Sequence, residues 1–198
     1  KGDVVDTVTT DEDGFAKSKE LYLGKYTVVE IKAPNGMVIN NEKHSVELTY
    51  AGQDVAVTET VTSFYNERQK VKISLEKVLE QNDTFGIGKN DEIKNISFGL
   101  YAKEDIVSSS GTVIPADGLI EIITLDENGK ATVNTDLPFG SYYIKEIATD
   151  EHYILSATQY PFTFEYAGQD TETVEIKVND GKPIENKLIY GSVSGKKI

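Results

Sequence analysis

The sequence predicts an all-β fold made of tandem β-sandwiches, and three observations lead to this prediction. Val, Ile, Thr and Tyr are plentiful, with 11 Tyr and 7 Phe but no Trp in 198 residues, and such residues favour strands. No segment shows a convincing helical period, whereas many short alternating segments are separated by turn signals. Much of the sequence also occurs twice at a spacing of about 120 residues, which suits tandem domains better than solenoid units.

The repeat appears as four pairs of matching segments. In the last pair, Asn66 precedes Lys77 by the same interval that separates Asn186 from Lys197. This register predicts a first repeat over 1–70 that lacks its opening strands, a complete repeat over 71–189, and the opening strand of a following repeat over 190–198. The pairs are TTDEDGFA (9–16) with TLDENGKA (124–131), LYLGKYTVVEIKAP (21–34) with LPFGSYYIKEIATD (137–150), LTYAGQD (48–54) with FEYAGQD (164–170), and FYNERQKVKISLEKV (64–78) with IENKLIYGSVSGKKI (184–198).

Alternation and turn residues predict where the strands lie. The segment VKISLEKVL (71–79) is the strand around which the chain is organised. Asp13-Gly14 and Asn128-Gly129 are dipeptides typical of hairpin turns. Further strands are expected over 3–10, 25–32, 45–50 and 55–65 in the first repeat, and over 96–103, 119–125, 141–148, 161–166 and 171–188 in the second.

The composition argues against several classes of function. A net charge of -13 is unsuited to nucleic acid, whose binding proteins need a cationic stripe. The absence of cysteine excludes disulfides, thiolate metal sites and cysteine nucleophiles. No apolar run is long enough to span a bilayer, so no membrane insertion is predicted for this segment. The acidic segments 11–13 and 126–128 are predicted to be turns rather than calcium sites, because they lack spaced oxygen ligands. No metal or cofactor is predicted.

Three polar residues fall at positions where the pattern predicts burial. Lys77, Glu146 and Asn186 each share a strand face with apolar neighbours, since alternate side chains of a strand point the same way. In the first repeat, Glu30 and Asn66 take the positions equivalent to the glutamate and the asparagine. Burying an unpaired ammonium ion is costly, so the repeated arrangement calls for either a partner or a chemical role.

An amine, a carboxyl and a carboxamide in one apolar interior can react with one another. Burial lowers the pKa of a lysine and raises that of a glutamate, so both groups are expected to be neutral. The Lys77 amine would then attack the Asn186 carboxamide with loss of ammonia, while Glu146 polarises the carboxamide oxygen and shuttles protons. The alternative is that the three are ordinary hydrogen-bonded residues, with Lys77 paired to Glu146 and Asn186 satisfying a strand end.

The segment LxxGxYxxxEIKAPxG (21–36), the strand-ending Asn66 and the lysine-containing strand after it resemble the Cna-B/SpaA-like repeats of Gram-positive pilins and adhesins. The resemblance covers nearly the whole chain as two successive repeats. It implies immunoglobulin-like sandwiches of the prealbumin (Cna-B) type, and internal Lys–Asn isopeptide bonds promoted by a glutamate. By position it implies a bond between Lys77 and Asn186 with Glu146 as catalyst, Glu30 as catalyst and Asn66 as acceptor for a lysine upstream of the chain, and Lys197 as the nucleophile of the following domain.

The resemblance and the repeated trio predict a structural function. We expect an extracellular, cell-wall-associated stalk segment of a Gram-positive pilin or adhesin, stabilised by autocatalytic isopeptide bonds. Its expected partners are neighbouring repeats of the same protein and sortase-linked pilus subunits, although the sequence contains no LPxTG-type signal. The alternative is an adhesin module that contacts a host surface protein or glycan through the long polar stretch 81–95. An enzyme with turnover is not predicted, because no exposed nucleophile–base pair is visible.

Overall fold

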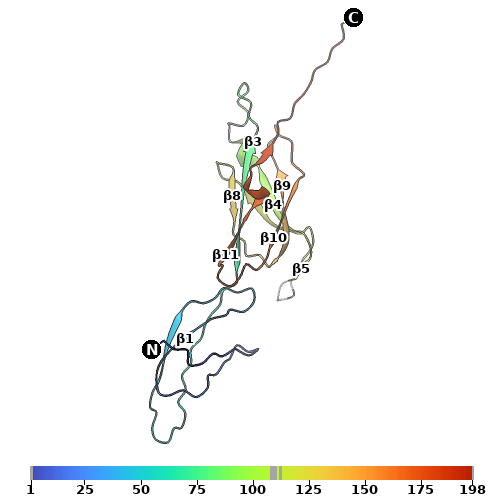
Figure 1. Ribbon diagram of the computed structural model, residues 1–198. Helices are drawn as coiled ribbons and strands as arrows, with labels where there is room; N and C mark the ends of the chain where they lie inside the picture. Colours follow the sequence, from blue (N-terminus) through green and yellow to red (C-terminus); the bar gives the residue numbers. More distant parts are fainter. Residues whose placement is uncertain (1, 108–110, 112, 198) are drawn as a thin grey trace. The chain divides into compact units, whose positions relative to one another are not determined.

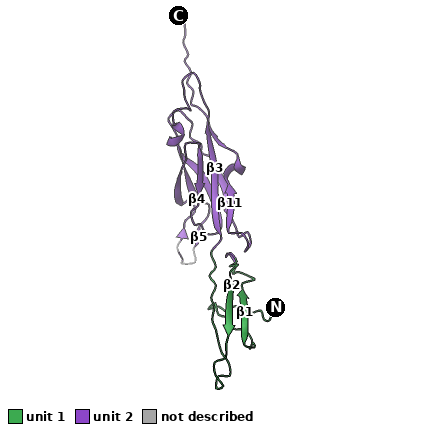
Figure 2. Ribbon diagram, turned by 90° about the vertical axis from the view of Figure 1, so that its left-hand side faces the viewer, with its two compact units in different colours: residues 1–34, 39–67 green, residues 35–38, 68–198 purple. Residues whose placement is uncertain are grey.

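The computed structural model describes residues 2–107, 111 and 113–197. The chain divides into two compact units, which Figure 2 distinguishes by colour. Unit 1 comprises Lys1–Pro34 and Ile39–Glu67, and unit 2 comprises Asn35–Val38 and Arg68–Ile198. The short segment 35–38 therefore packs with unit 2, where Met37 forms an isolated antiparallel bridge with Arg68.

Among its described residues, unit 1 contains one pair of strands, β1 (Gly24–Val29) and β2 (Lys43–Leu48). They pair antiparallel, and half-buried and exposed side chains alternate along both. The strands predicted over 25–32 and 45–50 are thus confirmed with shifted limits. Ala33 is the one hydrophobic residue of the described part of unit 1 that is buried, so the inner side chains of this strand pair are only half-covered.

Two strands predicted for the first repeat are wrong. The structure assigns no strand to residues 3–10 or 55–65, and most of their side chains are exposed. Alternation of apolar and polar residues describes which face a side chain would take, but a strand also needs a neighbour to accept and donate its backbone hydrogen bonds. The Asp13-Gly14 turn does form, with the Gly14 N–H donating to the carbonyl oxygen of Asp11 at 3.1 Å.

Unit 2 is a β-sandwich, and its first sheet has four antiparallel strands in the order β10–β9–β4–β7 (Figure 1). These strands confirm the ones predicted over 96–103, 119–125, 141–148 and 161–166. Their bounds are Ser97–Ala102 for β4, Leu119–Thr124 for β7, Gly140–Ala148 for β9 and Gln159–Phe164 for β10.

The second sheet of unit 2 is built on β3 (Lys70–Leu79), the strand predicted over 71–79. β3 pairs parallel with β11 (Thr173–Lys177) along its first half and with β12 (Ile184–Asn186) along its last residues. It also pairs antiparallel with β8 (Lys130–Val133), a strand that the sequence analysis missed. β7 and β8 therefore belong to different sheets, and the predicted turn at Asn128-Gly129 joins the two layers rather than one hairpin.

The single strand predicted over 171–188 is wrong, because the chain breaks there into β11, the 3-10 helix η2 (Val178–Gly181) and β12. Asn179 and Asp180 have φ of 55° and lie in the left-handed region, which Asn, Asp and Gly tolerate better than other residues. After this turn the chain returns to pair with β3 again. The break sets the register that places Asn186 near the end of β3.

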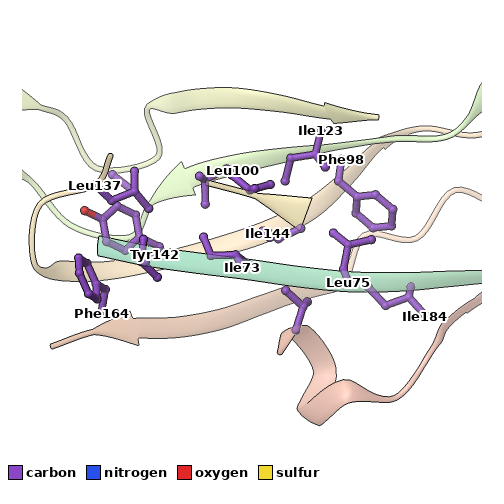
Figure 3. Close-up of a cluster of buried hydrophobic side chains, with 14 of the residues drawn as sticks. Ile73, Leu75, Phe98, Leu100, Ile123, Leu137, Tyr142, Ile144, Phe164 and Ile184 are labelled. Carbon is purple, nitrogen blue, oxygen red and sulfur yellow. The ribbon is translucent and has the colours of Figure 1, made fainter. Parts of the chain in front are cut away.

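The core of unit 2 lies between the two sheets, as the close-up in Figure 3 shows. β3 contributes Ile73 and Leu75, and the opposite sheet contributes apolar side chains from β4, β7, β9 and β10. The remaining elements are short: β5 (Ile106–Val107) pairs with β6 (Val113–Ile114), and η1 (Glu92–Asn95) is a 3-10 helix. The buried core residues are Val71, Ile73, Leu75, Ile96, Phe98, Leu100, Ala102, Ile106, Ile123, Val133, Leu137, Tyr142, Ile144, Phe164, Val178 and Ile184.

The predicted all-β fold of sandwich type is confirmed. Neither 3-10 helix, nor any other helical segment in the described part of the chain, has the length and apolar character needed to cross a membrane.

Candidate functional site

β3 carries Lys77 into the interior of unit 2. Buried positions alternate along β3 from Val71 through to Lys77, so the apolar residues that fix the inner face of the strand also fix the direction of the lysine. The Lys77 side chain is 0% exposed. Its Nζ donates a hydrogen bond to the carbonyl oxygen of Ile184 at 3.2 Å and lies 3.7 Å from Glu146 Oε1.

Glu146 and Asn186 meet Lys77 from two different sheets. β9 supplies Glu146 and β12 supplies Asn186, and both residues are buried. The Asn186 Nδ2 donates to Glu146 Oε1 at 2.8 Å and to Oε2 at 3.0 Å. Glu146 Oε2 also accepts the backbone N–H of Ser156 at 2.8 Å. The carboxyl group is therefore in contact with both the amine and the carboxamide.

The orientation of the Asn186 carboxamide differs from the expected one. The sequence analysis expected Glu146 to hydrogen-bond the carboxamide oxygen, but Glu146 accepts from the nitrogen instead. A carboxyl oxygen accepts the hydrogen bonds that the NH₂ end of an amide donates, so the carboxamide turns its nitrogen toward Glu146. Among the described residues, Asn186 Oδ1 is the buried side-chain polar atom that has no hydrogen-bond partner. Leaving such an atom unsatisfied is costly in a folded protein.

Burial changes the acid–base behaviour of the amine. Removal from water lowers the pKa of Lys77 from 10.5 to about 8, and the nearby negative charge of Glu146 offsets part of this effect. Desolvation dominates because the charged ammonium loses its hydration while the carboxyl oxygen remains 3.7 Å away. With a pKa of about 8, about a tenth of the Lys77 amine is neutral at pH 7, and the neutral form is the nucleophile.

Unit 1 contains the matching carboxyl–carboxamide pair. Asn66 Nδ2 donates to Glu30 Oε2 at 2.7 Å, and the same oxygen accepts the backbone N–H of Asn40 at 2.6 Å. In both units the glutamate binds a backbone N–H ten residues further along the chain. Glu30 and Asn66 are half-buried, whereas Glu146 and Asn186 are buried.

Lys197 lies apart from these groups. It belongs to the exposed segment that follows β12, to which the structure assigns no strand over residues 190–197. The predicted opening strand of a following repeat, and the role of Lys197 in it, therefore stay predictions.

The stretch 81–95, the alternative candidate surface, is an ordered loop. Its backbone pairs Asn82 with Ile87, and Glu92 is buried beneath it, where its carboxyl group accepts the backbone N–H groups of Gly88 and Asn90. Phe85 is 76% exposed at its tip. The binding role of this loop remains a prediction.

Sequence reasoning missed three contributors to the site. They are the backbone carbonyl of Ile184, the backbone N–H of Ser156 and the hydroxyl of Thr149, whose Oγ1 lies 2.9 Å from Asn186 Nδ2. A sequence pattern does not reveal which backbone groups will contact a side chain. Thr149 could have been noticed, because the two repeats differ at this position and the first repeat has Ala33 there. In the part of the chain that the structure describes, no cluster of His, Asp and Glu residues could hold a metal ion.

Comparisons with known proteins agree with this fold. The family model described as SpaA, a prealbumin-like fold domain, matches residues 1–62 and 83–182. The Trypsin-resistant surface T6 protein of Streptococcus pyogenes serotype M6 is 27% identical over 139 residues, which cover 68% of this chain and 24% of that protein. The chain thus spans about a quarter of the length of this relative.

Among solved structures, the Bacillus anthracis TIE protein has a TM-score of 0.57 at 22% identity, over 92% of this chain and 28% of that one. This likeness shows a shared fold. GBS52, the minor pilin of Streptococcus agalactiae, has a TM-score of 0.40 at 20% identity, over 96% of this chain and 71% of its own.

Proposed function

This chain belongs to the SpaA family of prealbumin-like fold domains, and on this premise we propose that it is a structural segment of a Gram-positive surface protein, the shaft of a pilin or the stalk of an adhesin. Unit 2 would be locked by an isopeptide bond between Lys77 and Asn186. The relative that is named a surface protein supports an extracellular, cell-wall-associated location. Its partners would then be neighbouring repeats and other pilus subunits.

The proposed reaction joins two side chains without a cofactor. The neutral Lys77 Nζ attacks Cγ of Asn186, a new C–N bond forms, and the C–Nδ2 bond breaks. One proton moves from Nζ to Nδ2 through the Glu146 carboxyl group, which contacts both nitrogens. The carboxamide nitrogen leaves as ammonia, so atoms and charges balance. The reaction happens once in each molecule and is not turnover.

The observation that carries the proposal is the geometry of Lys77, Glu146 and Asn186, which is poor for a stabilising ion pair with an ordinary hydrogen-bonded neighbour. The amine and the carboxyl oxygen are 3.7 Å apart, both side chains are fully buried, and Asn186 Oδ1 is left without a partner. A buried charged pair stabilises a fold only when its geometry and its remaining hydrogen bonds are good. An amide bond would remove the buried amine altogether. The arrangement suits a set of reactants better than a stabilising contact.

The bond would give the segment its mechanical role. It would join β3 to β12, so that tension along the chain passes through a covalent bond rather than through strand hydrogen bonds. It would also close a loop of about 100 residues, for which the cross-link entropy model gives about 4–5 kcal/mol. Resistance to unfolding and to proteases follows from the slower opening of such a loop.

Intact-mass spectrometry of the folded chain tests the proposal. We expect a mass lower than that of the sequence by one ammonia, and a branched peptide that joins the segments containing Lys77 and Asn186. The branched peptide is needed because an asparagine that cyclises to a succinimide also loses ammonia. Lys77→Met should abolish both signals, whereas Lys72→Met on the solvent-facing side of β3, where Lys72 pairs with Glu175, should keep them. A folded wild-type chain of unmodified mass would refute the bond.

A further inference from the structure

The environment of the Asn186 nitrogen contains one more acceptor than the carboxamide can use. Three oxygens surround Nδ2: Glu146 Oε1 at 2.8 Å, Glu146 Oε2 at 3.0 Å and Thr149 Oγ1 at 2.9 Å. A carboxamide nitrogen carries only two hydrogens. In the unreacted protein, the three acceptors must therefore share two N–H groups.

The match improves when the nitrogen gains a proton. After the amine has attacked, Nδ2 must be protonated before it can leave, and it then carries three N–H groups and a positive charge. Three N–H groups fit the three oxygens one to one. Groups that bind the intermediate better than the ground state lower the barrier of a reaction. Hydrogen bonds to a charged group are also stronger than bonds to a neutral one.

The carboxamide oxygen receives no comparable help. Within the described residues no donor reaches the buried Asn186 Oδ1, although charge develops on this atom during the attack. The assistance that the site offers is therefore concentrated on the departing nitrogen.

We infer that Thr149 is a catalytic residue of the proposed cross-linking reaction, whose hydroxyl oxygen accepts the third N–H of the leaving nitrogen. The inference rests on the proposed function. Thr149 follows the last residue of β9 and is half-buried, whereas Asn186 is buried. The equivalent residue of the first repeat, Ala33, has no side-chain oxygen. At this position the second repeat therefore has a hydroxyl group and the first repeat has none.

Refolding kinetics of three variants test the inference. The chain is isolated unfolded in denaturant, where the side chains are apart, and is then diluted into native buffer. Folding is followed by far-UV circular dichroism, and loss of ammonia by intact mass at successive times. Thr149→Ala copies the first repeat, Thr149→Val keeps the branched shape without the oxygen, and Thr149→Ser keeps the oxygen without the methyl group.

The three variants separate the hydroxyl from the shape of the side chain. We expect Thr149→Ala and Thr149→Val to cross-link about tenfold to hundredfold more slowly than wild type once folded. Thr149→Ser should stay within about threefold, since it keeps the acceptor oxygen. Because Val retains the shape of Thr, a folding defect in the alanine variant would leave the comparison intact. Wild-type cross-linking rates in folded Thr149→Val would overturn the role of the hydroxyl.

The wild-type chain tests the proposed isopeptide bond independently of the role of Thr149. If it folds and never loses ammonia, the Lys77–Asn186 bond does not form, and the role of Thr149 falls with it. If wild type cross-links and the variants match it, the bond stands and only the inference about Thr149 is overturned.

Discussion

Lys77 reaches the interior of unit 2 on its four-methylene stem, and its amine meets one carbonyl oxygen at 3.2 Å and one carboxyl oxygen at 3.7 Å. At the scale of single residues, these two contacts replace the hydration that an exposed ammonium would have. They replace it incompletely, which is why burial lowers the pKa of Lys77 to about 8. This incomplete replacement of hydration makes the charged form of Lys77 unfavourable for stability, and it also favours the neutral, reactive amine.

The pH dependence of cross-linking follows from this pKa. Below pH 8 the neutral fraction of the amine rises with pH, so the rate after refolding should rise about tenfold per pH unit. Above about pH 8 most of the amine is neutral, and the rate should level off. Rates are measured by intact mass in a series of buffers. A rate that keeps climbing toward pH 10, as expected for an amine with the ordinary pKa of 10.5, would contradict the buried environment.

At the scale of elements, the site depends on the register in which β12 pairs with β3. Ile184 pairs with Lys77, and Asn186 lies two residues further along the same strand face. This register begins at η2, where Asn179 and Asp180 adopt left-handed backbone angles. The turn therefore helps to set the register that brings the Lys77 amine and the Asn186 carboxamide together.

Substitutions of Asp180 test the conformational role of this turn. Asp180→Ala should lower the free energy of unfolding by about 1 kcal/mol, because alanine tolerates the left-handed region poorly. Asp180→Gly, the matched control, should stay within about 0.5 kcal/mol of wild type, since glycine adopts this region without strain. Urea unfolding followed by circular dichroism gives both values. Equal destabilisation by the two variants would show that the Asp180 side chain matters rather than its backbone angle.

At the scale of the whole molecule, the two units differ in how much core they possess. Unit 2 buries a cluster of apolar residues between two sheets. In the described part of unit 1, Ala33 is the buried hydrophobic residue, while Tyr22, Val61 and Val4 are 92%, 89% and 83% exposed. Burial of apolar surface is the main favourable contribution to folding, so the two units should differ in stability.

Limited proteolysis tests this difference. Trypsin should cut unit 1 first and leave a resistant fragment that begins after Arg68 or Lys70. Exposed lysines of unit 2, such as Lys103 and Lys130, serve as internal controls, because they are accessible but lie within a cooperatively folded unit. Mass spectrometry of the fragments over time identifies the first cuts. Early cleavage at Lys103 or Lys130 would contradict the stability difference.

Much of the second repeat could be predicted from the sequence. Period-two alternation over 71–79 assigned Lys77 to the inner face of its strand, and the repeat identified Glu146 and Asn186 as its companions. The same alternation failed over 3–10 and 55–65, where the structure assigns no strand. Alternation indicates which face of a strand a side chain would take. It does not indicate whether a neighbouring strand exists to complete the backbone hydrogen bonds.

By itself, the sequence determined the repeat, the sandwich class and the faces to which the three polar side chains belong, because these depend on local periodicity and composition. The tertiary structure alone decided which end of the Asn186 carboxamide meets Glu146, and that Thr149 Oγ1 stands beside the same nitrogen. It also decided that a left-handed turn interrupts the last strand. These features rest on distances and hydrogen bonds between segments far apart in the chain, which packing sets and local pattern does not encode.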